Sequence, residues 1–342
     1  TQKMRDNISR WILFRLSWNI PEYLVSGDCP QTNATTKPIR KEKESKHMEI
    51  HEFARKVSTA LQAELGEGYH VEYREVRKNN GVFLCGLLVT ARDRNVVPTI
   101  YLNDFWEAYE GGMTLSEVIR RVADIYLGET PDRDVDMDFF RSFEQVRDRI
   151  CYRLVGRARN RELLLDIPYL EYLDMAICFF YAFQSKELGE GSILVLNSHM
   201  EFWNTDKEEL MRLAQANTPR LYPWMCAPMD DILMGAMGED CDWEVPEEYD
   251  GQEDVPLFPM RVLSNRQQIN GASCVLYPGV LDQVAREMGC GFFLLPSSVH
   301  EMILLPDKGE ENPQGLKSMI VQVNRTQVPP EDILTDSLYR YD

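Results

Sequence analysis

MRVLSNRQQINGASCVLYPGVLDQVAREMGCGFFLLPSSVHE spans residues 260–301 and contains the strongest signals for the fold. Three short apolar runs predict buried strands: Met260–Leu263, Ala272–Leu276 and Phe292–Leu295. Pro278–Met288 has helical spacing, and a proline in the first helical turn gives up no hydrogen bond. Because strands and a helix follow one another closely, this stretch predicts a sheet with helices packed on it.

The rest of the second half continues this pattern. Asp174–Phe183 and Ser192–Asn197 are apolar runs that predict two more buried strands. Thr205 and Glu208 occupy the two ends of a capping box, which predicts the start of a helix. Four apolar residues at helical spacing predict a last helix: Leu316, Met319, Ile320 and Val323. We therefore expect residues 151–342 to form a mixed β-sheet with packed helices.

Residues 48–150 have a different order of elements. Apolar residues at helical spacing predict a helix over 49–65. Alternation over Tyr69–Arg77, the turn residues Asn79-Asn80-Gly81 and the run Val82–Ala91 predict a hairpin. Further elements are expected as a strand at Thr99–Leu102 and as helices over 115–126 and Phe139–Ile150. The predicted fold class is α+β, with 48–150 and 151–342 as two candidate subdomains.

Residues 1–47 have the composition of an appendage. They contain nine Lys or Arg residues and five acidic residues. The polar stretch Cys29–His47 has no helical or strand period, so we predict a basic, flexible N-terminal extension. Met48 would then be the natural start of the domain. The alternative is an arm that docks Trp11, Phe14 and Trp18 onto the body.

The chain as a whole is acidic, with a formal net charge of −18. General nucleic-acid binders and proteins of anionic membrane surfaces rely on positive charge, so the sequence disfavours both classes of partner. Nine acidic residues and no Lys or Arg fall within residues 238–256. We expect this acidic loop either to contact a basic protein partner or divalent cations, or to be a solvated insertion.

Cysteine usage and hydropathy indicate the compartment. The eight cysteines are widely spaced, mostly have apolar neighbours and form no CxxC pair. This pattern favours reduced, buried thiols and a cytoplasmic protein. The longest apolar run, Met175–Phe183, is far shorter than the roughly 20 residues that cross a bilayer. We therefore expect no membrane segment.

Motifs for metals and cofactors are all incomplete in the sequence. His51-Glu52 and His300-Glu301 lack the second histidine, four residues later, of a zinc protease. The acidic run Asp134–Asp138 lacks the later glycine and glutamate of a calcium-binding loop. Glycine pairs such as Gly289 and Gly291 lack the third glycine of a dinucleotide fingerprint. We therefore predict neither a metal nor a cofactor.

One stretch carries a candidate site. After the apolar run that ends at Pro296, two hydroxyls, an imidazole and a carboxylate follow within five residues: Ser297, Ser298, His300 and Glu301. Polar side chains also follow two other predicted strands: Asn197, His199 and Asn270. If these strand ends are neighbours, the seven side chains form one polar ligand rim. The alternative is structural, with a serine that caps a turn and His300 bound to the backbone.

An ordered series of short motifs resembles a known family. The most specific members are MRVLSN at 260–265, Asn270-Gly271-Ala272 and LLPSSVHE at 294–301, with Asp336-Ser337-Leu338-Tyr339 near the end. The series is similar to the uncharacterised bacterial family catalogued as domain of unknown function 5688, from about Met48 onward. A fainter likeness, on the helix with Glu209-Leu210, is to domain of unknown function 1444. Neither resemblance implies an activity or catalytic residues.

Because every catalytic signature fails a check, the sequence favours a non-enzymatic binding or regulatory module of the cytoplasm. The alternative is a hydrolase-like enzyme centred on Ser297, Ser298, His300 and Glu301.

Overall fold

A computed structural model describes residues 49–91, 99–129, 138–185, 189–232 and 259–342. The predicted N-terminal extension over 1–47 and the acidic loop over 238–256 lie outside these described residues, as does the acidic run 134–137.

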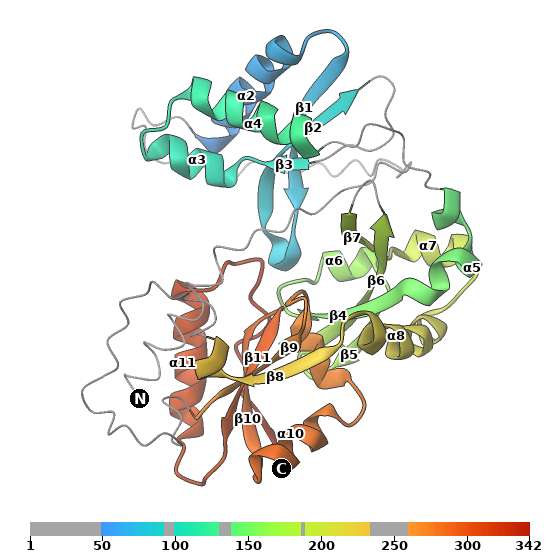
Figure 1. Cartoon of the computed structure of the whole chain (residues 1–342), viewed down its shortest axis with the longest axis vertical. Helices are drawn as coiled ribbons and strands as arrows, with labels where there is room; N and C mark the ends of the chain where they lie inside the picture. Colours follow the sequence, from blue (N-terminus) through green and yellow to red (C-terminus); the bar gives the residue numbers. More distant parts are fainter. Residues whose placement is uncertain (1–48, 92–98, 130–137, 186–188, 233–258) are drawn as a thin grey trace.

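The first part of the chain is a three-stranded antiparallel sheet with helices on one face (Figure 1). Its elements are α2 (Ile50–Leu65), β1 (Tyr69–Arg77), β2 (Phe83–Ala91), β3 (Thr99–Tyr101), α3 (Asn103–Glu110) and α4 (Leu115–Glu129). Phe53 and Leu61 of α2 pack with Leu87 of β2 and Val122 of α4 in one buried core. Thr114 and Glu117 form the capping box at the start of α4. The predicted helices and hairpin are confirmed here.

A second antiparallel sheet is built around β6. Its strands are β4 (Ile150–Gly156), β5 (Tyr169–Tyr172), β6 (Met175–Ser185) and β7 (Gly189–Leu194), and β6 pairs with all three others. Two short helices, α6 (Leu163–Asp166) and α7 (Asn197–Trp203), and the longer α8 (Lys207–Leu221) accompany it. From Met175 to Phe183 every residue of β6 is buried, because the strand is central and covered on both faces.

The third sheet has five strands in the order β12, β10, β11, β9, β8. They are β8 (Trp224–Pro228), β9 (Arg261–Asn265), β10 (Phe292–Ser298), β11 (Glu301–Pro306) and β12 (Tyr339–Tyr341). Helix α11 (Pro313–Thr326) buries Met319 and Ile320 against Leu295 and Ile303 on one face. On the other face, Leu294 and Leu304 join the core of the second sheet. Helix, sheet and sheet therefore form three layers, with α10 (Val280–Met288) beside them.

The α+β class with packed helices is confirmed, and within the described ranges all strand pairs are antiparallel. The strand–helix–strand order around α10 suggested strands of mixed direction. β9 and β10 do run the same way, but β11 lies between them and pairs with each in the antiparallel sense. The two-residue turn between β10 and β11 makes this insertion possible.

Three predicted elements were wrong in detail. Ala272–Leu276 is part of a 3-10 helix, Gly271–Leu276, because a short buried apolar run has no period that separates strand from helix. Phe139–Ile150 is not one helix but a series of short helical segments, Asp138–Arg141, Phe143–Val146 and Arg147–Arg149, and β4 begins at Ile150. Ser192–Asn197 splits, since β7 ends at Leu194 and α7 begins at Asn197.

The tip of the β1–β2 hairpin attaches the first sheet to the rest of the chain (Figure 1). Asn80 has a left-handed backbone, and its side-chain nitrogen donates to the carbonyls of Pro330 and Ile333. Asn160 accepts the Asn80 main-chain N–H and donates to the Asn80 side-chain oxygen. The division at residue 150 stays a prediction.

Candidate functional site

Ser298, His300 and Glu301 meet at the turn between β10 and β11. The Ser298 hydroxyl donates to Glu301 Oε1 at 2.7 Å and accepts the main-chain N–H of His300 at 3.0 Å. Ser298 and Glu301 are buried and lie opposite each other in the strand register. A buried carboxylate that accepts a hydroxyl proton satisfies part of its hydrogen-bonding need inside the fold.

Both ring nitrogens of His300 have partners. The main-chain N–H of Asn270 lies 3.2 Å from Nδ1, and Asp332 Oδ1 lies 3.2 Å from Nε2. Because a backbone N–H only donates, Nδ1 must be the acceptor and Nε2 must hold the proton that Asp332 accepts. The His300 ring therefore bridges two segments of the chain, which contain Asn270 and Asp332. We call Asn270, Ser298, His300, Glu301 and Asp332 the hairpin clasp.

Close backbone packing surrounds the hairpin clasp. Ser264 Oγ donates to the His300 carbonyl at 2.8 Å, and the Val299 N–H donates to the Asp332 carbonyl. A Cβ at Gly271 would collide with Ser264 Oγ and with the carbonyl oxygen of His300. Asn270, the residue before Gly271, has a left-handed backbone and is the N-cap of the 3-10 helix. The Asn-Gly pair is thus required by the close approach of the two segments.

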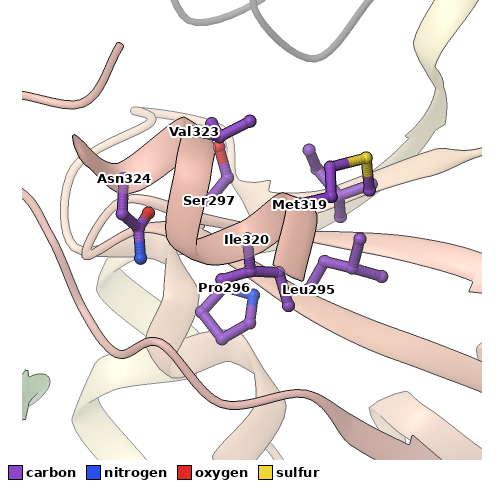
Figure 2. Close-up of a pocket in the computed structure, with 8 residues that line it drawn as sticks. Leu295, Pro296, Ser297, Met319, Ile320, Val323 and Asn324 are labelled. Carbon is purple, nitrogen blue, oxygen red and sulfur yellow. The ribbon is translucent and has the colours of Figure 1, made fainter. Parts of the chain in front are cut away.

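Ser297 lies beside the hairpin clasp but faces a different part of the fold. Its hydroxyl is buried, has no hydrogen-bond partner among the described residues, and lines a cavity of about 10 Å³ under α11. Figure 2 shows the Ser297 side chain directed toward α11, among Met319, Ile320 and Val323. A space of this size holds at most one water molecule. It cannot hold a substrate.

The structure places Asn197 and His199 on α7, with partners outside the hairpin clasp. Asn197 donates to the carbonyl of Leu165, and His199 Nδ1 accepts the N–H of Leu196 at 3.1 Å. The His199 ring packs against Phe140 and Trp203. Burial lowers the pKa of His199 below its ordinary value, so the ring is held neutral. Of the seven predicted rim residues, the contacts join Asn270, Ser298, His300 and Glu301.

Sequence reasoning missed the segment that receives His300. Asp332 belongs to residues 330–336, which we call the C-terminal strap. The C-terminal strap accepts hydrogen bonds from Asn79 and Asn80 of the first hairpin and from Asn324 of α11. Its Thr335 donates to Asp174 in the turn before β6. The sequence showed the turn signal of Asn79-Asn80-Gly81 and the family motif that begins at Asp336, but Asp332 itself lies in no motif and in no periodic run.

A second group of titratable side chains lies between α2 and β1. His51 Nδ1 is 2.6 Å from the Tyr73 hydroxyl, 3.4 Å from Glu75 Oε1 and 3.9 Å from Cys85 Sγ. All three partners share one ring nitrogen, whereas a catalytic triad uses both. In the ranges that the structure describes, no cluster of three or more His, Cys, Asp or Glu side chains could hold a metal ion.

Thiols and helices bear on the expected compartment. Cys151 and Cys178 are buried, and burial raises the pKa of each thiol to about 12. Six cysteines of the described residues are free: Cys85, Cys151, Cys178, Cys226, Cys274 and Cys290. None of the helices in the described part of the chain has the length and apolar character that crossing a membrane requires.

Comparison with protein families identifies the relationship. Residues 50–342 match the model of a family described as "Family of unknown function (DUF5688)". The chain belongs to this family. The DUF5688 match begins at the first residue of α2 and includes all three sheets, so the resemblance seen in the sequence is confirmed. No curated protein and no solved structure matches the chain.

Proposed function

We propose that this DUF5688 protein is a non-enzymatic binding or regulatory module of the bacterial cytoplasm. The observation that carries the proposal is the internal pairing of the hairpin clasp: both nitrogens of His300 and the hydroxyl of Ser298 are engaged by the protein's own groups. The hydroxyl proton of Ser298 and both ring nitrogens of His300 are then used within the fold, so these side chains stabilise it and offer no donor to a substrate.

The hydrolase alternative requires a different arrangement. A serine nucleophile that uses His300 as its base needs a hydrogen bond from its hydroxyl to a nitrogen of the imidazole ring. Ser298 instead donates a hydrogen bond to Glu301, and its contact with His300 is to the main-chain N–H. Ser297 faces the cavity of about 10 Å³. The geometry therefore supports a structural role for these residues better than a catalytic one.

The partner we propose for the module is a protein rather than a nucleic acid or a membrane. The net charge of −18 favours a basic surface and repels phosphates. The acidic loop over 238–256 remains a candidate contact for it on charge alone. The free, mostly buried thiols support the cytoplasmic location.

A serine-directed probe tests this proposal. The native chain and a Ser298→Ala variant are incubated with a fluorophosphonate and with a panel of short-chain aryl esters. We expect the intact mass to stay unchanged and ester turnover of both proteins to stay at the background rate. A fluorophosphonate adduct on Ser297 or Ser298, or turnover that Ser298→Ala abolishes, would establish the hydrolase alternative instead.

A further inference from the structure

Strand β1 forms an edge of the first sheet, and α2 covers only half of that edge. The N–H of Lys78 donates to the carbonyl of Val82, which sets the even-numbered residues of β1 toward β2. The odd-numbered residues therefore direct their N–H and C=O groups outward. At Val71, Gln62 accepts the N–H at 2.9 Å and Ser58 donates to the carbonyl at 3.2 Å. Gln62 also donates to the carbonyl of Tyr69.

The second half of the edge has no such cover among the described residues. Tyr73, Glu75 and Arg77 direct their main-chain groups outward in the same way, and no hydrogen bond from a described residue reaches those groups. Strand edges of this kind are templates for pairing with another extended segment. Ser58 and Gln62 of α2 form hydrogen bonds with the outward main-chain groups of Tyr69 and Val71, and neither side chain reaches beyond Val71.

A polar hollow of about 570 Å³ lies beside this open half. It is lined by Glu49, His51, Glu52 and Arg55 at the start of α2 and by Glu75 of β1. Three carboxylates and one guanidinium give the hollow a negative balance when His51 is neutral. The Glu75 side chain is 53% exposed, so its charge is accessible from the hollow.

We propose that the β1 edge from Tyr73 to Arg77 binds an extended peptide with basic side chains as an added strand. Main-chain hydrogen bonds to the three outward-facing residues would hold the peptide, and its Lys or Arg side chains would enter the hollow. The inference rests on the proposed binding function and names its partner class. The acidic balance of the whole chain favours the same partner.

A second copy of the chain fits this edge less well than a basic peptide. Antiparallel self-pairing centred on the open residues would place Glu75 opposite its own symmetry mate, and like charges in that position are destabilising. A nucleic acid would bring phosphates against the carboxylates of the hollow. A basic peptide meets neither obstacle.

A peptide titration tests the proposal on the full chain. The probe is an acetylated and amidated seven-residue peptide of alternating Val and Lys, labelled with fluorescein, and a Val–Glu peptide is the charge control. We expect saturable binding of the Val–Lys peptide, with slowed amide hydrogen exchange at Tyr73, Glu75 and Arg77. The Val–Glu peptide should bind at least tenfold more weakly.

Three variants separate main-chain pairing from charge. Arg77→Pro removes an outward N–H, keeps the Glu75 carboxylate and removes no hydrogen bond of the β1–β2 ladder, since proline is tolerated at an edge position. Glu75→Lys keeps the main chain and reverses the charge. We expect each to weaken binding at least tenfold. Glu64→Lys, the same charge reversal on the exposed far end of α2, is the matched control and should bind as the native chain does.

Three results would overturn this inference. The first is no binding up to millimolar peptide, and the second is equal affinity of Glu75→Lys and Glu64→Lys for the peptide. The third is slow hydrogen exchange at the three amides before the peptide is added. These outcomes are distinct from a failure of the proposed function. A fluorophosphonate adduct would contradict the non-enzymatic module and leave the peptide result intact.

Discussion

Gly271 is the position where a single added methyl group should do most damage to the hairpin clasp. Its absent side chain leaves room for Ser264 Oγ and the His300 carbonyl. We expect Gly271→Ala to lower the free energy of unfolding by about 1–3 kcal/mol, because overpacking forces the backbone apart. Urea denaturation measures it. Gly68→Ala, where a Cβ would meet no atom within 4 Å, is the control and should be nearly neutral.

His199 should make the fold sensitive to acid. Burial lowers its pKa in the folded chain, whereas in the unfolded chain it titrates near 6.5. Below that pH the unfolded state binds the extra proton, so stability falls as the pH falls from about 7 to 5. His199→Asn keeps an acceptor for the Leu196 N–H and removes the titration. Unfolding free energies at several pH values should therefore fall less steeply for the variant, and parallel curves would refute the assignment.

At the scale of elements, the C-terminal strap and its neighbours tie the sheets together through Asp174. Its carboxylate accepts from the hydroxyls of Thr335, Ser337 and Tyr339. Burial disfavours the charge, but these hydrogen bonds outweigh it and hold the pKa of Asp174 below its ordinary value.

Asp174→Asn should therefore destabilise the protein near neutral pH, by about 1–2 kcal/mol for a partly exposed charged acceptor. The carboxylate contributes its stability above its unfolded pKa of about 3.9, and loses it as the pH falls through the lower folded value. The difference between variant and native chain should shrink over that acid range. A difference that is constant with pH would assign the loss to packing and not to the charge.

Elements with a clear period were predictable from the sequence, and short buried runs were not. The 3.6-residue spacing of α2 and the alternation of β1 specified their type, and the Asn-Asn-Gly turn specified the hairpin. Residues 271–275 are all buried, so the apolar run fits a strand and a 3-10 helix equally. β11 was missed because its two-residue turn coincides with the polar cluster that resembled a site.

The candidate site shows a similar limit. The side chains of Ser298 and Glu301, which are close in sequence, do meet on the tight turn, and Ser298 also contacts the main-chain N–H of His300. Asp332 reaches His300 only through tertiary folding, and no local pattern indicates it. Asn197 and His199 follow β7 in the chain, but their hydrogen bonds and ring contacts are with Leu165, Leu196, Phe140 and Trp203 rather than with the hairpin clasp. The order of strands in a sheet decides which strand ends lie side by side, and local sequence patterns do not specify that order.

At the scale of the whole molecule, we propose that the body folds without residues 1–47. The DUF5688 match begins at Ile50, and α2 contributes four buried residues to the first core: Phe53, Ala54, Val57 and Leu61. A chain that starts at Met48 should melt within a few degrees of the full chain. A larger loss would support the alternative in which Trp11, Phe14 and Trp18 dock onto the body. Differential scanning calorimetry of the two chains makes the comparison.

We infer that His300 and Asp332 stabilise the fold rather than carry out catalysis, and a double-mutant cycle distinguishes these two roles. We predict that His300→Ala and Asp332→Ala each lower the free energy of unfolding by about 1–3 kcal/mol, since each leaves a buried or half-buried partner unpaired. The double variant should lose less than the sum, with a coupling energy of at least about 0.5 kcal/mol. If both single variants left the free energy of unfolding unchanged and showed no coupling, the stabilising role of His300 and Asp332 would be contradicted. The hydrolase alternative would then be favoured for His300.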